Sequence, residues 1–418
     1  MVAGSGTNSS STSQTLAMRT WALAQSWDAA AEKFIKHFNA LNERITIFAG
    51  AFNRQFDGLG SGDGKPLGGS EEAVIAMAHG LADAGKEVFV YCHLPDGKSR
   101  TPHSEVKWRD ASTFDPAGPH GTLLAWRAPK LMSKLKGNGY PVILWLMDPE
   151  YGAPAWDYAE ADDVVFLTHT HRDIVRRKDG YDGGGSVVHI GLPELPAIGT
   201  IKRDEHSVMW ATSPDRGLLE FLQEVWPDVI REVPDAKLNI FYGLEPLEKG
   251  GKEDLARAIR AEIKESTGVF LRGGVPDEEL YDWYERSSVF AFRCVGFEET
   301  LSVATLKAMA MGCYPVVNTV GCLPEVIGLG GGLAVPNERY THELIQTLKH
   351  PIPAVVRSEI ARRARQVFSV ESMTEKMLRV IDFRPMQPER PYTALAGAVD
   401  VFVNARPSAP PRPSAPAP

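Results

Sequence analysis

Two successive series of short apolar runs, alternating with segments of helical periodicity, constrain the fold of this chain most strongly. The runs of the first series are nearly continuous in apolar residues, which is typical of strands buried on both faces of a parallel sheet. The helix predicted over Glu71–Ala84 follows the first run and ends before Gly85, a residue suited to the left-handed turn after a helix. The strands predicted for this series are Ile45–Ala49, Glu87–Cys92, Thr122–Trp126, Val142–Met147, Val164–Thr168 and Ser186–Ile190.

A second series follows the weakly patterned stretch Leu192–Glu205. Its predicted strands are Ser207–Ala211, Lys237–Tyr242, Val269–Arg272, Val289–Phe292, Tyr314–Asn318 and Gly332–Val335, and the intervening helices begin near Pro214, Lys252, Pro276, Ser302 and Leu323. A chain of 418 residues exceeds what one hydrophobic core usually fills. We therefore predict the α/β class, with two Rossmann-like doubly wound domains, residues 44–195 and 204–350, facing a cleft.

The two ends of the chain differ from these domains in composition. Residues 1–17 are rich in Ser, Gly and Thr, and residues 385–418 end in the proline-rich sequence RPSAPPRPSAPAP, so both are predicted to be disordered. Residues 18–43 predict an added amphipathic helix, with Trp27, Phe34, Phe38 and Leu41 near one face. Packing on the core is favoured over a membrane or partner surface, because the polar face of this helix is not strongly basic.

Charge and cysteine content exclude some functional classes. Forty-five basic against fifty-three acidic side chains give a net charge of −8, so nucleic acid is a possible but unfavoured partner. One compact basic cluster is present, formed by Arg172, Arg176, Arg177 and Lys178. It is either an ordinary solvated helix face or a surface that attracts an anionic acceptor. The four cysteines form no CxxC pair, and no signal peptide or membrane-spanning run is evident. We therefore predict a cytoplasmic protein in a reducing compartment.

Three motifs follow predicted strands, where doubly wound sheets bind ligands. Gly68 and Gly69 precede the first helix, where they let backbone N–H groups approach an anion; an ordinary helix start capped by Ser70 is the alternative. The pattern is neither GxGxxG nor a GxxxxGK[ST] phosphate loop, so it indicates neither NAD nor ATP.

The other two motifs lie in the second series. Ser213 is a plausible N-cap before Pro214, which places Arg216 in the first helical turn, where its guanidinium can hold a phosphate. The third motif runs from Gly296 to Ser302 and contains Glu298, Glu299 and Thr300; N–H groups of Leu301 and Ser302 could bind a pyrophosphate. Alternatively, the two glutamates only complement the helix dipole.

Possible acceptor-side residues lie at strand ends of the first domain. Asp148 follows one predicted strand, and His169 and His171 follow the next; a histidine there could orient a hydroxyl group. The alternative for the two histidines is a hydrogen-bonded structural loop. No third metal ligand accompanies them, and no DxD pair follows a strand, so we predict no metal site.

Several of these motifs together resemble one family. The segments GGSEEAV, ATSPDRGLLEFLQEVWPDVIREVPDAKLNIFYG, GGVPDEELYDWYERSSVFAF, GFEETLSVATLKAMAMGCYPVVNTVGCLPEVIG and GGLAVP occur in the same order as in retaining GT-B glycosyltransferases of the glycogen-synthase-like class, glycosyltransferase family four. The resemblance covers about Arg44 to Pro336 and is stronger in the second domain. It implies that the second domain holds a nucleotide-sugar donor. It also implies that residues 355–382 return to the first domain.

The resemblance also implies roles for individual residues. Glu299 matches the first Glu of an E-x7-E element, which contacts the transferred sugar, but Lys307 stands where a second Glu contacts the donor ribose. Arg216 matches the basic phosphate-binding position, although Leu218–Glu224 lacks the usual second basic residue. The remaining residues expected around the donor are Gly68, Gly69, Ser213, Gly217, Gly274, Glu298, Thr300, Leu301 and Ser302.

The activity implied is transfer of a hexose or pentose with retained configuration, without metal or other cofactor, from a UDP- or GDP-linked sugar. Glu299, His169 and Asp148 are the catalytic candidates. The hydroxyl acceptor stays open between a saccharide, a lipid-linked glycan, a protein and a modified DNA base. Two alternatives also stay open: a catalytically silent GT-B binding module, suggested by Lys307, and a sugar-nucleotide epimerase.

Overall fold

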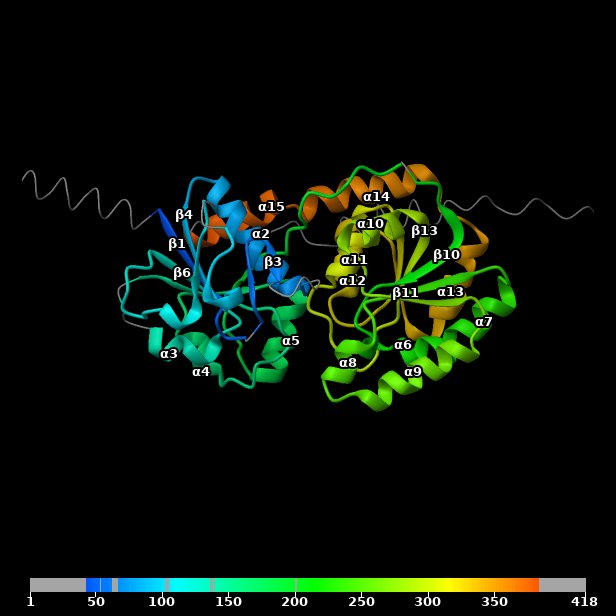
Figure 1. Cartoon of the computed structure of the whole chain (residues 1–418), viewed down its shortest axis with the longest axis horizontal. Coiled ribbons are helices and arrows are strands. Elements are labelled where there is room, and N and C mark those ends of the chain that lie inside the picture. Colours follow the sequence, from blue (N-terminus) through cyan, green and yellow to red (C-terminus); the bar gives the residue numbers. More distant parts are fainter. Residues whose placement is uncertain are drawn as a thin grey trace, which may run out of the picture.

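The computed structural model describes residues 43–52, 54–61, 67–101, 105–135, 138, 140–199 and 201–382. The predicted disordered ends and the predicted N-terminal helix up to Asn42 lie outside these residues. The described chain forms two lobes side by side, joined by crossing segments (Figure 1). Each lobe is a parallel sheet with helices packed against it, so the chain has the α/β class and the pair of Rossmann-like domains that the alternating pattern predicts.

The sheet of the first lobe has the order β5-β4-β1-β6-β7-β8-β9. Every pair in it is parallel, and the order reverses between β1 and β6, which is the point where such sheets bind ligands. The strands are β1 (Arg44–Phe48), β4 (Glu87–Cys92), β5 (Lys107–Asp110), β6 (Thr122–Trp126), β7 (Val142–Trp145), β8 (Asp163–Phe166) and β9 (Ser186–Val187); a separate antiparallel hairpin pairs β2 (Phe56–Asp57) with β3 (Gly60–Ser61). Helices of this lobe are α2 (Gly69–Asp83), α3 (Met132–Leu135), α4 (Ala155–Ala159) and α5 (His169–Asp179).

The sheet of the second lobe has the order β12-β11-β10-β13-β14-β15 and reverses between β10 and β13. Its strands are β10 (Asp204–Trp210), β11 (Lys237–Phe241), β12 (Val269–Gly273), β13 (Ser287–Phe292), β14 (Tyr314–Asn318) and β15 (Leu333–Val335). Its helices are α6 (Leu218–Glu220), α7 (Trp226–Glu232), α8 (Glu245–Lys249), α9 (Glu253–Glu265), α10 (Asp277–Arg286), α11 (Val303–Ala310), α12 (Leu323–Gly330) and α13 (Asn337–Lys349). A 3₁₀ turn, Pro214–Arg216, precedes α6, and a π turn, Phe221–Val225, joins α6 to α7.

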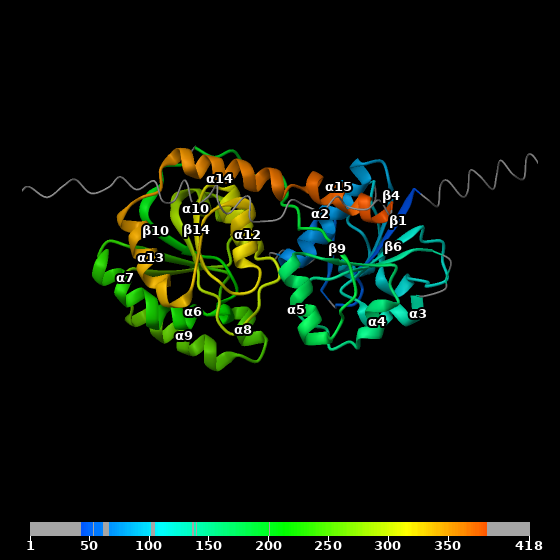
Figure 2. The same cartoon turned by 180° about the vertical axis from the view of Figure 1, so that it is seen from behind.

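The chain crosses between the lobes twice. After β9 it passes to the second lobe, and α14 (Ala354–Val367) then packs on α11 and α12 of that lobe. The last described helix, α15 (Val370–Ile381), lies back on the first lobe beside α2 (Figures 1 and 2). Gly80 of α2 leaves room for this contact, because a Cβ there would lie 2.1 Å from Thr374 Oγ1.

All twelve predicted strands occur, and Gly85 adopts the positive φ of +85° expected after α2. Strand β5 was not predicted, because Lys107–Asp110 contains only one apolar residue, the buried Trp108. The alternative in which Ser70 caps the first helix does not hold: α2 begins at Gly69, Gly68 is the N-cap, and no side chain caps it. Ser213 likewise makes no cap bond, because the residues after it form a short turn and α6 starts only after Gly217.

Candidate functional site

The carboxyl ends of β10 and β13 bring Arg216 and Glu299 together at the reversal point of the second sheet. Arg216 Nη1 lies 3.2 Å from Glu299 Oε1, and its guanidinium stacks on the Phe297 ring, 3.1 Å from the centroid. Burial raises the pKa of Glu299, while the neighbouring Arg216 opposes that rise. Gly217, with φ of +107°, lets the chain turn tightly here, since a Cβ would lie 2.5 Å from the Arg293 carbonyl.

Lys252 is a second cationic residue close to Arg216, and it does not belong to α6, the helix that follows Arg216. Lys252 Nζ lies 2.6 Å from Asp215 Oδ2, and Ser213 Oγ donates to Asp215 Oδ1 at 2.6 Å. Burial acts to raise the pKa of Asp215, but the bonds from Lys252 and Ser213, with Arg216 nearby, outweigh it and lower that pKa. The fold thus brings to this corner a basic residue that is absent from Leu218–Glu224.

Two helix starts meet across the lobes beside this corner. A Cβ on Gly69, the first residue of α2, would lie 2.7 Å from Val303 Cγ2 at the start of α11, so glycine is needed for this approach. Among the described residues, no hydrogen bond is made by the main-chain N–H groups of Leu301 or Ser302, which precede α11. Ser302 Oγ accepts from Thr305 at 2.8 Å. The geometry leaves donor groups near Arg216 that suit an anion.

Lys307 lies in α11 and forms an ion pair with the first lobe. Its Nζ is 3.1 Å from Glu72 Oε2 in the first turn of α2, and its side chain is only 8% exposed. Burial acts to lower the pKa of Lys307, but Glu72 and Tyr281 outweigh it and raise that pKa, so the lysine is held in its charged form. A carboxylate therefore does lie beside position 307, but it comes from the other lobe.

Other residues predicted to hold the donor also contact the first lobe. Glu298 pairs with Arg177 at 2.5 Å and with Lys178 at 3.4 Å, both on α5. Thr300 Oγ1 donates to the Met147 carbonyl at 2.7 Å, and the Thr300 carbonyl accepts from Thr168. These contacts engage two of the four basic side chains of the α5 cluster. Of the remaining predicted residues, Leu301 is buried, and Gly274 directly follows β12.

On the first lobe, Asp148 is paired with a residue that sequence reasoning missed. Arg127, directly after β6, donates to both Asp148 oxygens at 2.7 and 2.8 Å and stacks on Phe52 at 3.5 Å. Arg127 has φ of +56°, a strained conformation for a residue other than glycine. Its Nη1 also lies 3.9 Å from Glu71 of α2. The signal available in the sequence was its place after a predicted strand.

The two histidines after β8 differ in their surroundings. His171 is fully buried; its Nδ1 accepts from the Leu167 N–H and its Nε2 donates to the Asp148 carbonyl at 2.8 Å. Burial lowers its pKa to about 4, so it is a neutral structural residue. His169 begins α5, and its N–H donates to Glu325 of α12 at 2.9 Å. Glu325 also accepts from the Thr170 N–H and hydroxyl, so its carboxylate caps α5 across the lobes.

The described part of the chain holds neither a cluster of metal-ligating side chains nor a membrane-spanning helix. Within residues 43–382, apart from the gaps given above, no three His, Cys, Asp or Glu side chains lie together as metal ligands. Over the same residues, no helix has the length and hydropathy required to cross a bilayer. The cysteines Cys92, Cys294, Cys313 and Cys322 are free and buried.

Comparison with known proteins agrees with this architecture. Residues 208–350 match the family model described as glycosyl transferases group 1, whereas no curated protein sequence matches the chain. Among solved structures, sucrose-phosphate synthase from Thermosynechococcus elongatus is 16% identical, with a TM-score of 0.59, over 81% of this chain and 98% of the other. AviGT4, a glycosyltransferase of avilamycin A biosynthesis, is 14% identical, with a TM-score of 0.55, over 81% and 98%. Anabaena Alr3699/HepE with UDP and glucose is 15% identical, with a TM-score of 0.57, over 81% and 99%.

At such identities the solved structures establish the fold alone. Residues 208–350 therefore resemble the group 1 glycosyl transferases, and the chain as a whole has the two-lobed GT-B fold.

Proposed function

We propose that the protein transfers a hexose or pentose from a nucleotide-diphosphate sugar to a hydroxyl acceptor, with retention of configuration. The observation that carries this proposal is the Arg216–Glu299 pair at the reversal point of a domain that resembles the group 1 glycosyl transferases, beside the unused N–H groups before α11. Alr3699/HepE has been solved with UDP-glucose, which favours a UDP-linked donor; GDP is the alternative.

In this mechanism the chain's own groups supply charge and position. Arg216, with Lys252 held nearby through Asp215, compensates the charge of the departing diphosphate, together with the helix starts at Gly69 and Ser302. Glu299 accepts hydrogen bonds from hydroxyls of the transferred sugar. The departing phosphate oxygen accepts the proton of the incoming hydroxyl on the same face, so the new bond forms with retained configuration. No metal is needed for this charge balance.

The roles assigned to the first lobe are more limited. In this proposal Asp148, which is bonded to Arg127, orients an acceptor hydroxyl, whereas His169 contributes through its position at the start of α5. The acceptor remains a hydroxyl compound of unassigned class. A nucleic-acid acceptor is disfavoured, because Arg177 and Lys178 are already paired with Glu298.

The test is calorimetric titration with UDP-, GDP- and ADP-sugars, followed by analysis of the product. We expect one donor to bind, Arg216→Ala to weaken that binding at least tenfold, and Glu299→Gln to abolish transfer while leaving binding measurable. Arg231→Ala, an exposed arginine on α7, serves as the control. Failure of every donor to bind would refute the proposal, and an inverted product would refute retention.

A second candidate is a catalytically silent binding module. The observation that favours it is the Lys307–Glu72 pair, which occupies the place expected for a ribose-binding carboxylate. Donor binding without transfer or hydrolysis, unchanged by Glu299→Ala, would support this candidate. Conversion of the donor sugar without an acceptor would instead identify an epimerase.

A further inference from the structure

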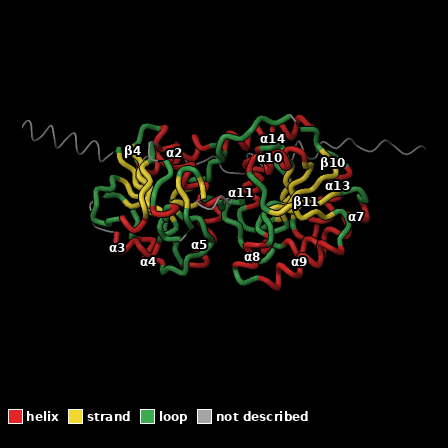
Figure 3. The backbone as a smooth tube through the Cα atoms, in the orientation of Figure 1, coloured by secondary structure: helices red, strands yellow, loops and turns green. Residues whose placement is uncertain are grey.

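The loop that carries Glu299 is attached to the first lobe as well as to the second. Residues 298–300 lie between β13 and α11 and have no regular secondary structure. Figures 1 and 3 show α5 on the side of the first lobe that faces the second. The Glu299 side chain contacts Arg216 of the second lobe, whereas its two neighbours in the sequence, Glu298 and Thr300, contact the first lobe.

Thr300 makes the more buried of these two links. Its hydroxyl donates to the carbonyl of Met147, which follows β7, at 2.7 Å, and its own carbonyl accepts from the Thr168 hydroxyl at 3.0 Å. Thr168 is the N-cap residue of α5 and is fully buried, and Thr300 is only 8% exposed. A buried polar group that loses its partner is not rescued by water, so these bonds fix Thr300 to the first lobe.

Glu298 makes the second link, to the other end of α5. Its carboxylate lies 2.5 Å from Arg177 and 3.4 Å from Lys178. The side chains of Arg177 and Glu298 are 57% and 35% exposed, so water and salt weaken this ion pair. It therefore adds to the link through Thr300 but contributes less.

A third connection reaches α5 through the main chain of Glu299. The Cys322 N–H donates to the Glu299 carbonyl at 2.9 Å, and Gly321 packs so closely that a Cβ there would lie 2.5 Å from the same oxygen. Cys322 precedes α12, on which Glu325 accepts hydrogen bonds from the first N–H groups of α5. Both the neighbours of Glu299 and its carbonyl partner are thus tied to one helix of the other lobe.

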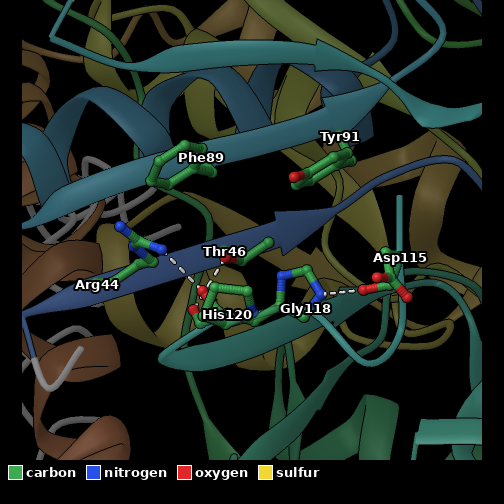
Figure 4. A pocket seen from close by; sticks show the side chains of 8 residues that line it. Arg44, Thr46, Phe89, Tyr91, Asp115, Gly118 and His120 are labelled. Carbon is green, nitrogen blue, oxygen red and sulfur yellow. Dashed lines mark hydrogen bonds between the residues drawn. The ribbon is translucent and has the colours of Figure 1, made fainter. Parts of the chain in front are cut away.

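A hollow of about 210 Å³ also lies on the first lobe, over β1 and β4, but the lobe's own side chains fill its border (Figure 4). Arg44 lies over the Phe89 ring, 4.8 Å from its centroid, and Phe114 packs on Tyr91 and His120 at 5.2 and 4.7 Å. None of the residues that line it belongs to α5. The connection from the first lobe to Glu299 therefore does not involve this hollow.

We propose that Glu298 and Thr300 are positioning residues, which hold Glu299 against the donor sugar only while the two lobes are in contact. This inference rests on the proposed transfer function. Separation of the lobes would break both links and release the loop, whereas Arg216 and Lys252 would stay together on the second lobe. Binding of the diphosphate and alignment of Glu299 are therefore separable, because alignment alone needs both lobes.

Hydrogen exchange at the Cys322 N–H tests the link without any nucleotide, because its acceptor is the Glu299 carbonyl. Thr300→Val removes the bond to Met147, so exchange at Cys322 should become at least about fivefold faster, whereas Thr300→Ser should keep the original rate. Thr347→Val is the matched control, since this hydroxyl is also buried and donates to a carbonyl at 2.8 Å, but within α13. Unchanged exchange in Thr300→Val, or equal acceleration in Thr347→Val, would overturn the proposal.

Kinetic measurements then separate positioning from binding. Turnover is followed as release of UDP from UDP-glucose, or of GDP from a GDP-sugar if that is the donor that binds. For Thr300→Val we expect kcat to fall at least about tenfold, while the dissociation constant of the free nucleotide changes less than about twofold and Thr300→Ser recovers kcat. A loss of nucleotide affinity as large as the loss of kcat would overturn the proposal, because Thr300 would then bind the donor itself.

A substitution on the first lobe provides a second variant with little risk of unfolding. Arg177→Ala removes an exposed ion pair with Glu298, so kcat should fall about twofold at low salt and the difference should vanish at high salt. Arg231→Ala, which removes an equally exposed pair with Asp228 inside the second lobe, should leave kcat unchanged. If no nucleotide sugar binds, the proposed transfer fails, and hydrogen exchange at Cys322 still decides whether the first lobe holds Glu299.

Discussion

The Lys307–Glu72 pair allows a quantitative prediction about how the lobes are held together. The two charges lie 3.1 Å apart, and the exposed fractions of the side chains are 8% for Lys307 and 23% for Glu72. Glu72→Gln leaves the buried ammonium group without its ion-pair partner, and we expect it to lower the free energy of unfolding by about 3 kcal/mol. Lys307→Met leaves a carboxylate that is closer to water and whose pKa burial already raises, so it should cost only about 1 kcal/mol.

The double variant separates this electrostatic account from simple loss of packing. If the cost of Glu72→Gln comes from the stranded ammonium group, adding Lys307→Met removes that charge, and the double variant should be more stable than Glu72→Gln alone. The assay is urea unfolding, followed by both fluorescence and circular dichroism so that coincident transitions can be verified. Equal costs for the two single variants, with a double variant equal to their sum, would refute the reasoning.

An exposed pair of the same residue types provides the control. Lys349 Nζ lies 2.5 Å from Glu232 Oε2, with side chains 37% and 42% exposed. Water and salt screen such a pair, so Glu232→Gln should leave the unfolding midpoint nearly unchanged. A large shift for this control would show that the assay does not distinguish buried from exposed charges.

Three further predictions concern the contact between the lobes and its support. Glu325→Ala removes three hydrogen bonds to the start of α5 and should cost about 2 kcal/mol, with faster hydrogen exchange at Thr170 as the readout; unchanged exchange would contradict it. Gly69→Ala should destabilise the chain, because its Cβ would lie 2.7 Å from Val303, and Val303→Ala should restore stability; a neutral Gly69→Ala would exclude this close packing. Burial lowers the pKa of His171 to about 4, so this side chain binds a proton more readily in the unfolded chain. The free energy of unfolding should therefore fall as the pH drops from 6.5 to 4, by about 2 kcal/mol at pH 5. His171→Gln should remove that part of the pH dependence.

The sequence was sufficient for the fold because the fold depends on local patterns. Apolar runs such as Val142–Trp145 are buried along their whole length, which is why they could be recognised without any partner strand. The same reasoning placed Arg216 and Glu299 at strand ends. Because β10 and β13 are neighbours in the sheet, the segments that follow them lie side by side, and Arg216 and Glu299 come within 3.2 Å of each other.

The charge partners could not be predicted in the same way. Glu72 and Lys307 are 235 positions apart, and Glu325 is 156 positions from His169, so no local spacing signals either contact. Lys252 could not be predicted from the family resemblance, which places the second basic residue within Leu218–Glu224, because in the fold it comes from the start of α9. The close approach of Gly69 to Val303 could not be predicted either, because the two residues belong to different lobes.

Three cationic groups of the site share one electrostatic property, which bears on how the diphosphate of the proposed donor would bind. The guanidinium of Arg216, the ammonium of Lys307 and the start of α5 each face a carboxylate of the chain: Glu299, Glu72 and Glu325. An incoming diphosphate therefore does not meet bare positive charge; it must share or displace internal partners, so part of its interaction energy is offset by the contacts it replaces. Glu299 illustrates this best. A sugar hydroxyl that donates a hydrogen bond to the Glu299 carboxylate would replace its contact with Arg216, and the guanidinium could then bind the phosphate. If the proposed transfer is correct, sugar and diphosphate should thus bind more favourably together than either does alone, so that the donor is distinguished from the spent nucleotide.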